Sequence, residues 1–179
     1  MKSTILGGDL KEIPNCYITI PRGGKIPMKI LPDISDGKSA SYNDEAVIGR
    51  SYPMKTYSHS ENRSINWTAY FMVCKQSDIY TNLNYLRYIE SAVYPKQNFL
   101  PYAPPPVCQI ACGDLLVPLA NGEKELCVVL KSYSVKFPTD VPWDEETNLP
   151  YRFSVDMNWE VVYNSNDLPG QEDILTLGW

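Results

Sequence analysis

The chain contains a single histidine, and its surroundings do not predict a nucleophilic active site. His59 lies between Ser58 and Ser60, in a segment expected to form a short strand. Neighbouring residues of a strand point to opposite sides of the sheet, so neither serine is expected to pair with the imidazole. A histidine at the end of a strand is typically a surface residue. We therefore expect no catalytic role for His59.

Metal and phosphate sites are not predicted either. Cys108 and Cys112 have a metal-like spacing, but a zinc site needs about four ligands and no second pair is suitably placed. On a strand, residues four apart share a face, which predicts two small buried hydrophobic side chains. The acidic run 144–146 lacks the spaced oxygen ligands of a calcium loop and is expected to be a solvated turn. The glycine pairs at 7–8 and 23–24 match no phosphate-binding loop. We expect a protein without enzymatic activity, metal or cofactor.

Composition limits the partners. A chain of 179 residues is expected to form one main domain, and its net charge of −5 argues against a dedicated nucleic-acid binder. The five cysteines are odd in number and irregularly spaced, and no signal-peptide pattern is found, so reduced thiols in a protein made in the cytoplasm are expected. No segment approaches the roughly 20 apolar residues of a membrane span, so no membrane association is predicted.

The clearest structural signal is the strict alternation of apolar and polar residues over positions 151–163. This segment is much longer than an ordinary strand of about five to six residues. Its period of two predicts one face in a core and the other against water or a partner. The polar side consists of Arg152, Ser154, Asp156, Asn158 and Glu160.

The remaining elements complete a mainly β protein. An apolar stripe with helical spacing predicts a helix from about Ser77 to Tyr94, with Ser77 as N-cap. Strands are expected at 26–31, 46–48, 54–59, 64–73, 107–111, 115–119 and 126–137, with an Asn-Gly hairpin turn at 121–122. Loops are expected at 33–45 and 138–150. Because strands and helices do not alternate, we predict an antiparallel β-sandwich or open barrel with one packed α-helix.

The domain organisation is predicted to have three parts. Residues 1–24 are expected to form an N-terminal arm, because prolines and a glycine pair bracket their one good strand candidate at 16–20. Residues 25–163 form the β domain. Residues 164–179 form a polar tail with an apolar end, and Leu175 and Trp179 are its candidate docking residues. Both terminal segments are expected to become ordered only against neighbouring proteins.

Several motifs in a fixed order resemble the tube and baseplate proteins of contractile phage tails and related injection systems. Pro105-Pro106-Val107, followed by Gly113, resembles the segment after the family's helix; Tyr133 to Phe137 resembles its Tyr-x-x-Phe strand. Pro150-Tyr151-Arg152-Phe153 resembles the start of its last alternating strand. The similarity covers roughly residues 25–163. The chain departs from the family by inserting residues 139–148 before the last strand and by lacking a LysM module, so peptidoglycan binding is not implied.

The resemblance implies a tail-tube-type fold of two packed sheets with a flanking helix. It also implies a virion protein that forms a ring of six copies at the junction of tail tube and baseplate. Expected partners are other copies, the tail tube and the baseplate or hub proteins, with DNA passing through the lumen. The polar side of residues 151–163 would line that lumen or contact a neighbouring subunit, and its acidic groups would repel DNA. The candidate ring-contact residues are Asp36, Lys38, Tyr42, Asp140, Trp143 and Glu145.

An alternative is a carbohydrate- or receptor-binding β-module of the tail tip. Exposed tyrosine and tryptophan rings could stack on sugars in such a module. Trp67 and Trp159, however, fall on the apolar sides of their predicted strands. Their expected place is the core, which weakens this alternative.

Overall fold

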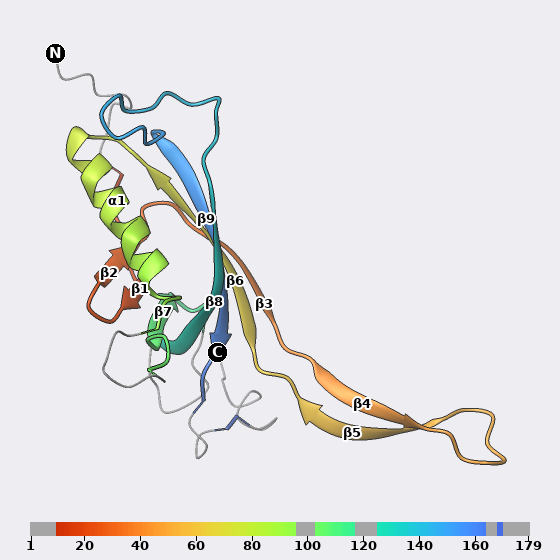
Figure 1. Ribbon diagram of the computed structural model, residues 1–179. Helices are drawn as coiled ribbons and strands as arrows, with labels where there is room; N and C mark the ends of the chain where they lie inside the picture. Colours follow the sequence, from red (N-terminus) through yellow and green to blue (C-terminus); the bar gives the residue numbers. More distant parts are fainter. Residues whose placement is uncertain (1–9, 96–102, 117–124, 164–167, 170–179) are drawn as a thin grey trace.

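The computed structural model describes residues 10–95, 103–116, 125–163 and 168–169. Within these ranges the chain forms nine strands and one helix (Figure 1). In chain order the elements are β1 (Cys16–Ile20), β2 (Gly24–Pro27), β3 (Asp33–Gly37), β4 (Ala40–Glu45), β5 (Met54–Ser60), β6 (Ser64–Met72), α1 (Gln76–Ser91), β7 (Cys108–Cys112), β8 (Leu126–Lys136) and β9 (Arg152–Val161).

Seven strands form one antiparallel sheet in the order β2-β1-β7-β8-β9-β6-β3, and β4 and β5 form a separate two-stranded hairpin. The mainly β, antiparallel architecture with one helix is thereby confirmed. The finer description, a sandwich or open barrel of tail-tube type, stays a prediction. In the described part of the chain, no helix is long and apolar enough to cross a membrane.

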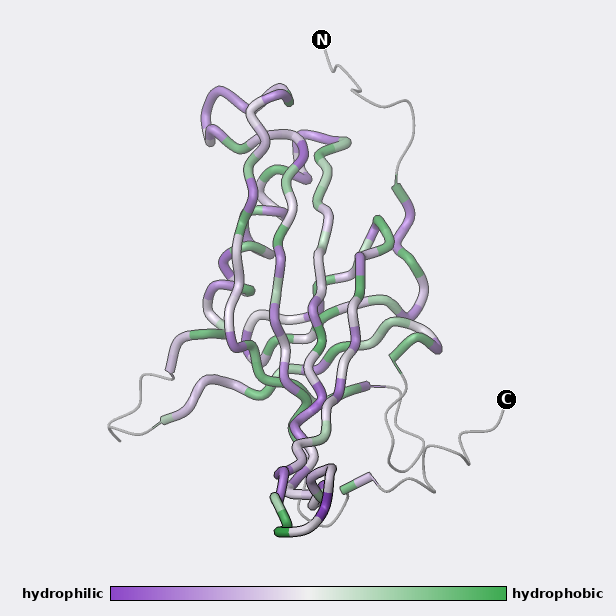
Figure 2. Tube along the Cα trace, turned by 90° about the vertical axis from the view of Figure 1, so that its right-hand side faces the viewer, coloured by the Kyte–Doolittle hydropathy of each residue, from purple (hydrophilic) through white to green (hydrophobic). Residues whose placement is uncertain are grey.

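Strand β9 occupies an inner position of the sheet, paired to β6 on one side and to β8 on the other. The predicted alternation along it is confirmed: its core-facing residues are buried and its other residues remain partly or fully exposed. The core-facing set is Phe153, Val155, Met157, Trp159 and Val161. Figure 2 shows the same alternation of hydrophobic and hydrophilic residues along the long strands. Burial of one face therefore fixes the register of the central strands, since a slip by one residue would turn every apolar side chain to water.

Helix α1 packs on the core face, on the same side of the long strands as β1, β2 and β7 (Figure 1). Its residues Leu86 and Ile89 are buried. Tyr85 approaches Phe71 of β6 with ring centroids 6.4 Å apart, and Phe71 stacks on Phe153 at 5.1 Å. The helix thus closes the core that the sheet leaves open, and the opposite face of the sheet is left uncovered by it.

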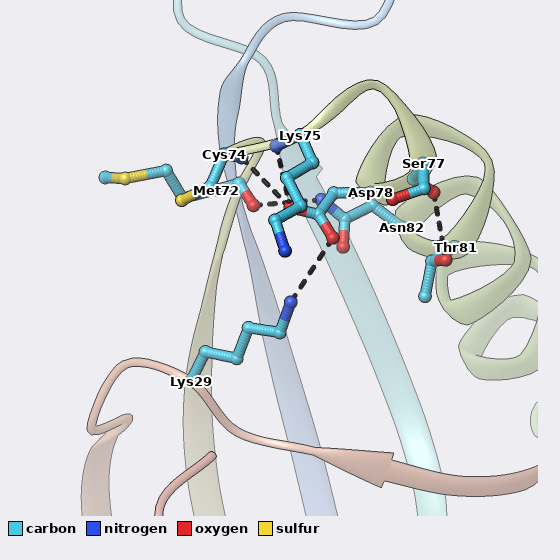
Figure 3. A network of polar contacts seen from close by, with 8 residues as sticks. All are labelled: Lys29, Met72, Cys74, Lys75, Ser77, Asp78, Thr81 and Asn82. Carbon is cyan, nitrogen blue, oxygen red and sulfur yellow. Dashed lines mark hydrogen bonds and ion pairs between the residues drawn. The ribbon is translucent and has the colours of Figure 1, made fainter. Parts of the chain in front are cut away.

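A polar network fixes the start of α1 (Figure 3). The carboxylate of Asp78 accepts hydrogen bonds from the backbone N–H groups of Cys74 and Lys75 at 3.1 and 3.0 Å, and Lys29 Nζ lies 3.4 Å from its other oxygen. Burial by itself would raise the pKa of this carboxyl, but the two backbone donors and Lys29 outweigh burial and lower the pKa. The helix accordingly begins one residue before the predicted Ser77, with Lys75 as N-cap, and it ends at Ser91 rather than Tyr94.

The expectation of an N-terminal arm is wrong for the residues from Cys16 onward. Strand β1 lies inside the sheet between β2 and β7, and its residues Cys16, Ile18 and Ile20 are buried. The turn residues that follow β1, at positions 21–23, instead make the tight connection between β1 and β2. At Gly23 a Cβ atom would approach the ring of Tyr88 to 2.9 Å, so the close passage under α1 requires a glycine here.

Three smaller expectations also differ. Residues 33–45 are not a loop but contain β3 and β4, because pairing with β6 and β5 supplies the hydrogen bonds that their polar composition does not predict. Residues 46–48 lie at the end of the hairpin, not in a strand. Leu115 and Leu116 lie in a turn and a bend rather than at the start of a strand. Residues 117–119 and the predicted turn at 121–122 lie outside the described residues.

Candidate functional site

The side of the sheet that α1 leaves uncovered is mostly hydrophilic, and we call it the polar face. It consists of the even-numbered residues of β9 and their register partners on β8, β6 and β3. One row across these four strands is Ser132, Asn158, Asn66 and Ser35; the next is Ser134, Asp156, Thr68 and Asp33. The five residues predicted to share one side, Arg152, Ser154, Asp156, Asn158 and Glu160, do lie on this face, and the lumen or inter-subunit role given to them stays a prediction.

The carboxylates of the polar face are paired. Asp156 lies 2.7 Å from Lys136 Nζ and accepts a hydrogen bond of 2.7 Å from Thr68 Oγ1. Glu160 lies 2.8 Å from Lys131 Nζ and accepts a hydrogen bond of 2.6 Å from the Asn62 side chain. These lysine and side-chain donors lower the pKa of both acids.

The surface is therefore of mixed charge rather than acidic. Asp33 also has a partner on it, since the hydroxyl of Tyr70 donates a hydrogen bond of 2.5 Å to its carboxylate. Lysines and the exposed Arg152 offset the acids. The expected acidic repulsion of DNA by this face is thus not supported by the charges on it; what the face offers is a hydrophilic surface without a continuous basic track for phosphates.

The β4–β5 hairpin stands away from the sheet at the end where β3 and β6 meet it (Figure 1). Every residue of β5, and every residue of β4 except Ser41, is exposed on both faces of the ribbon. Six paired residues span about 20 Å. Within the chain, the hairpin is held by its own contacts, including an ion pair of 2.6 Å between Lys55 and Asp44.

Large apolar and aromatic side chains are concentrated on this exposed ribbon. Tyr42 and Tyr57 contact each other edge-to-face with centroids 5.8 Å apart, and both remain more than half exposed. At the tip, Ile48 is fully exposed and Tyr52 is 84% exposed. Such an accumulation on a thin ribbon is typical of a surface that a partner covers.

The hairpin also carries the histidine, and here one expectation is wrong. Ser58 Oγ lies 3.1 Å from His59 Nδ1, and Glu61 Oε1 lies 3.0 Å from His59 Nε2. The sequence argument that strand neighbours do not pair therefore fails locally. All three residues are exposed on the ribbon, whereas the two hollows described below lie on the main sheet. The contacts place a serine, a histidine and a carboxylate in a chain of hydrogen bonds on an exposed ribbon.

At the end of the polar face opposite the hairpin lies a groove of about 490 Å³. Its walls combine the aromatic rings of Tyr70 and Phe137 with the charged side chains of Lys136, Asp140 and Arg152. A second, smaller hollow of about 290 Å³ lies in the middle of the face, beside the register shift of β8. Serine and asparagine line it together with the apolar side chains of Trp67, Tyr133 and Met157. The groove is the larger of these two hollows.

The predicted ring-contact residues occupy three different places. Asp36 is part of β3, on its core-facing side, where it accepts two hydrogen bonds from Arg63 Nε at 2.8 and 3.0 Å. Lys38 is exposed, with Nζ 5.9 Å from the ring centroid of Tyr163. Tyr42 is on the hairpin, as described above.

The remaining three lie in the connection before β9. Asp140 borders the groove, and Trp143 and Glu145 are exposed. The acidic turn expected here is partly wrong, because Asp144 is buried and accepts hydrogen bonds from the backbone N–H and the hydroxyl of Thr147 at 2.9 and 2.7 Å. Those two donors lower the pKa of the Asp144 carboxyl. Leu175 and Trp179, the candidate docking residues, lie outside the described residues.

Two of the tryptophans lie in the core, which weakens the alternative of a sugar-binding module, while Trp143 remains exposed. Trp67 and Trp159 are fully buried, as the alternation of their strands predicted. Cys108 and Cys112 are buried on the same face of β7, also as predicted. Among the described residues, no group of three His, Cys, Asp or Glu side chains is placed to hold a metal ion.

Comparison of the sequence with protein-family models and with curated proteins gave no match. The function is therefore inferred from the surfaces of the chain.

Proposed function

We propose that this chain is a structural subunit that assembles with further copies of itself into a ring, without a catalytic role. We further propose, from the resemblance of its motifs, that the ring has six copies and lies at the junction of tail tube and baseplate of a contractile tail. The protein would then be made in the host cytoplasm and end in the virion. The observation that carries the proposal of assembly is the β4–β5 hairpin.

The hairpin is hard to explain in a protein that acts alone. A two-stranded ribbon without a core is marginally stable in water, and this one exposes both of its faces. Burying a side chain of the size of Ile48 in a partner contributes roughly 1.5–3 kcal/mol. Contacts at Ile48 and Tyr52 would therefore stabilise both the association and the hairpin itself.

The placement of the hairpin favours a ring over a two-fold dimer. The groove bordered by Tyr70 and Phe137 lies at the opposite end of β6 from the hairpin. If the hairpin of one copy contacts the groove end of the next, the two surfaces differ, and the association is heterologous. Heterologous contacts generate rings when the rotation closes and filaments when it does not.

The polar face suits the inner wall of such a ring. Its serine, threonine and asparagine rows stay hydrated, and its lysine–carboxylate pairs leave no continuous basic track on the described strands. DNA binding depends mainly on lysine and arginine contacts to phosphates. A wall of this kind would let DNA pass without holding it.

Removing the hairpin tests the proposal directly. Residues 38–62 are replaced by Asn-Gly, which joins β3 to β6 across their terminal pair Gly37 and Ser64 by a short turn and keeps Arg63 beside Asp36. The expected result is a folded monomer with the unfolding transition of the intact domain, while the full chain forms rings by mass photometry and negative-stain microscopy. A full chain that stays monomeric at high concentration and with its tail partners would overturn the proposal.

Point variants locate the contact. Ile48→Ser together with Tyr52→Ser should abolish rings without changing the unfolding midpoint, because both side chains are exposed in the single chain. Leu115→Ser is the matched control, since Leu115 is 67% exposed but lies far from the hairpin in the sequence. Assembly that is lost equally in both variants would show that the hairpin tip is not the contact.

A footprint provides an independent measurement. Trypsin should cut the monomer first after Arg50 and Lys55, because both lie in the exposed hairpin. In the assembled form these two sites should be protected. Rings in which the hairpin is cut as fast as in the monomer would contradict its role, and rings that do not bind a tail tube would overturn the location but not the assembly.

A further inference from the structure

Two buried thiols meet across neighbouring strands far from the assembly surfaces. Cys16, the first residue of β1, and Cys112, the last residue of β7, are register partners, and their Sγ atoms lie 3.3 Å apart. Both side chains are almost completely buried. We propose that Cys16 and Cys112 are a site of oxidation, at which a cross-strand disulfide links β1 covalently to β7. This inference does not depend on the proposed function.

The ladder places the pair where a disulfide fits. The N–H of Gly113 donates a hydrogen bond of 2.9 Å to the carbonyl of Asn15, one step further along the same register. In an antiparallel ladder, hydrogen-bonded and non-hydrogen-bonded pairs alternate, so Cys16 and Cys112 occupy a non-hydrogen-bonded pair, in which Cα atoms are about 4.5 Å apart. Disulfides span Cα separations of about 4.4–6.8 Å. Bond formation therefore needs side-chain rotation, with little movement of the strands.

The other cysteines provide natural comparisons. Cys108 lies on the same buried face of β7, but its Sγ points to the carbonyl oxygen of Pro106 at 3.7 Å. Cys74 lies beyond the end of β6, next to the start of α1. Neither of these two side chains has the sulfur–sulfur contact that the structure shows between Cys16 and Cys112. Oxidation of the folded chain is thus expected to link this pair in preference to Cys74 and Cys108.

The reaction needs a small two-electron oxidant, and hydrogen peroxide is a suitable one. A thiolate of the pair attacks one peroxide oxygen, hydroxide leaves and takes up a proton, and a sulfenic acid forms. The second thiol then loses its proton and displaces the sulfenic oxygen as water, closing the S–S bond. Together the two thiols give up two protons and two electrons, and these reduce one peroxide to two waters.

The oxidation should be slow. Burial, the hydrogen bond between the two thiols and the charge of a Cys112 thiolate raise the pKa of Cys16 to about 12, so the reactive thiolate is scarce at neutral pH. Access requires local opening, which is easier here than in the middle of the sheet because the pair is the terminal one of β1 and β7. The thiols are thus expected to stay reduced in a reducing cytoplasm and to close under prolonged oxidising conditions.

The disulfide should stabilise the fold. Its cysteines are 96 positions apart, so the bond restricts a long loop of the unfolded chain. The chain-entropy estimate for a loop of this length corresponds to a rise in Tm of about 10 °C for a domain of this size. In the sheet, β1 and β2 would become covalently attached to β7.

The test uses the full chain, treated with hydrogen peroxide at pH 8, blocked with N-ethylmaleimide and digested for mass spectrometry. The expected product is a linked peptide pair containing Cys16 and Cys112, lighter by two hydrogen atoms, with a raised Tm that dithiothreitol reverses. Cys74→Ser should retain both signals, and Cys16→Ala and Cys112→Ala should each lose them. The two alanine variants are first compared in the reduced state, so that a folding defect is distinguished from loss of the bond.

Two results would overturn the inference. One is a folded chain in which other cysteines link in preference to Cys16 and Cys112. The other is a folded chain that gives no linked pair, while the same chain in urea oxidises readily to disulfides.

Discussion

An aspartate introduced at one of two neighbouring residues of β9 should affect the stability of the fold very differently, because the two residues face opposite sides of the sheet. Val155 is fully buried, with Val135 of β8 and Ala69 of β6 as its register partners. Ser154, one residue earlier, faces the polar side opposite Lys136. Val155→Asp and Ser154→Asp therefore introduce the same side chain into a core and beside a cation, and they form a matched pair.

The expected loss for Val155→Asp is close to the total stability of a domain. Removing a buried valine side chain costs about 2 kcal/mol. Keeping the new carboxyl neutral at pH 7, about three pH units above its usual pKa, costs about 4 kcal/mol. A buried hydroxyl and carbonyl without partners add about 1–3 kcal/mol. The sum of about 7–9 kcal/mol compares with a typical unfolding free energy of about 5–15 kcal/mol, whereas Ser154→Asp should change it by less than about 1 kcal/mol.

Urea unfolding followed by tryptophan fluorescence measures both variants, since Trp67 and Trp159 are fully buried and report on the core. Val155→Asp should be largely unfolded at pH 7. Its deficit should shrink by about 1.4 kcal/mol for each pH unit as the pH falls toward 4, because the neutral carboxyl then forms without cost. Equal urea midpoints for the two variants at pH 7, or a deficit independent of pH, would refute the assignment of the two faces.

Two further matched pairs test the helix start and the sheet edge. Asp78→Asn should lower the unfolding free energy by about 1–2 kcal/mol through loss of the charged acceptor for two backbone N–H groups, and Lys29→Met by less than about 1 kcal/mol because its ion pair is long and partly exposed. Since the pKa of Asp78 is lowered in the folded state, its contribution is fully present above the unfolded-state pKa of about 3.9 and is lost as the pH falls through the folded-state value. A urea midpoint gap between wild type and Asp78→Asn that does not narrow as the pH falls below about 3.9 would contradict this. Gly23→Ala should lower Tm, because the new Cβ atom would lie 2.9 Å from the ring of Tyr88. Gly37→Ala should leave Tm within a few degrees, because the space around Gly37 is open. Equal shifts of Tm for the two variants in calorimetry would show that the contact at Gly23 is not tight.

The elements predicted well from the sequence are those whose pattern is local and long. The alternation of β9 specifies a strand and both of its faces, and the stripe of α1 specifies a helix to within three residues at each end. In both cases many successive residues follow the same periodic pattern, so the pattern is seldom a coincidence. The burial of Trp67 and Trp159 followed from the same periodicity.

The elements predicted poorly depend on distant partners. Strand β1 looked like part of an arm because it is five residues long and bracketed by turn residues, and it is buried only because β7 pairs with it about a hundred residues later. The polar segment of β3 and β4 looked like a loop because nothing in its own composition predicts the pairing with β6 and β5. The contact between Ser58 and His59 was missed because it depends on side-chain rotation rather than on strand alternation.

The class of the fold, the helix, and the apolar and polar sides of the central strands could thus be predicted from the residues alone. The periodicity of the sequence encodes which way each side chain points, and the hydrophobic effect acts on that local pattern. The pairing of strands in the folded chain sets which strands are neighbours. From that pairing follow the rows of the polar face, the hairpin that leaves the domain, the groove at the opposite end and the contact between Cys16 and Cys112. Strand pairing brings together residues whose separation along the chain carries no local signal, because the favourable free energy comes from the whole buried core and not from either segment alone.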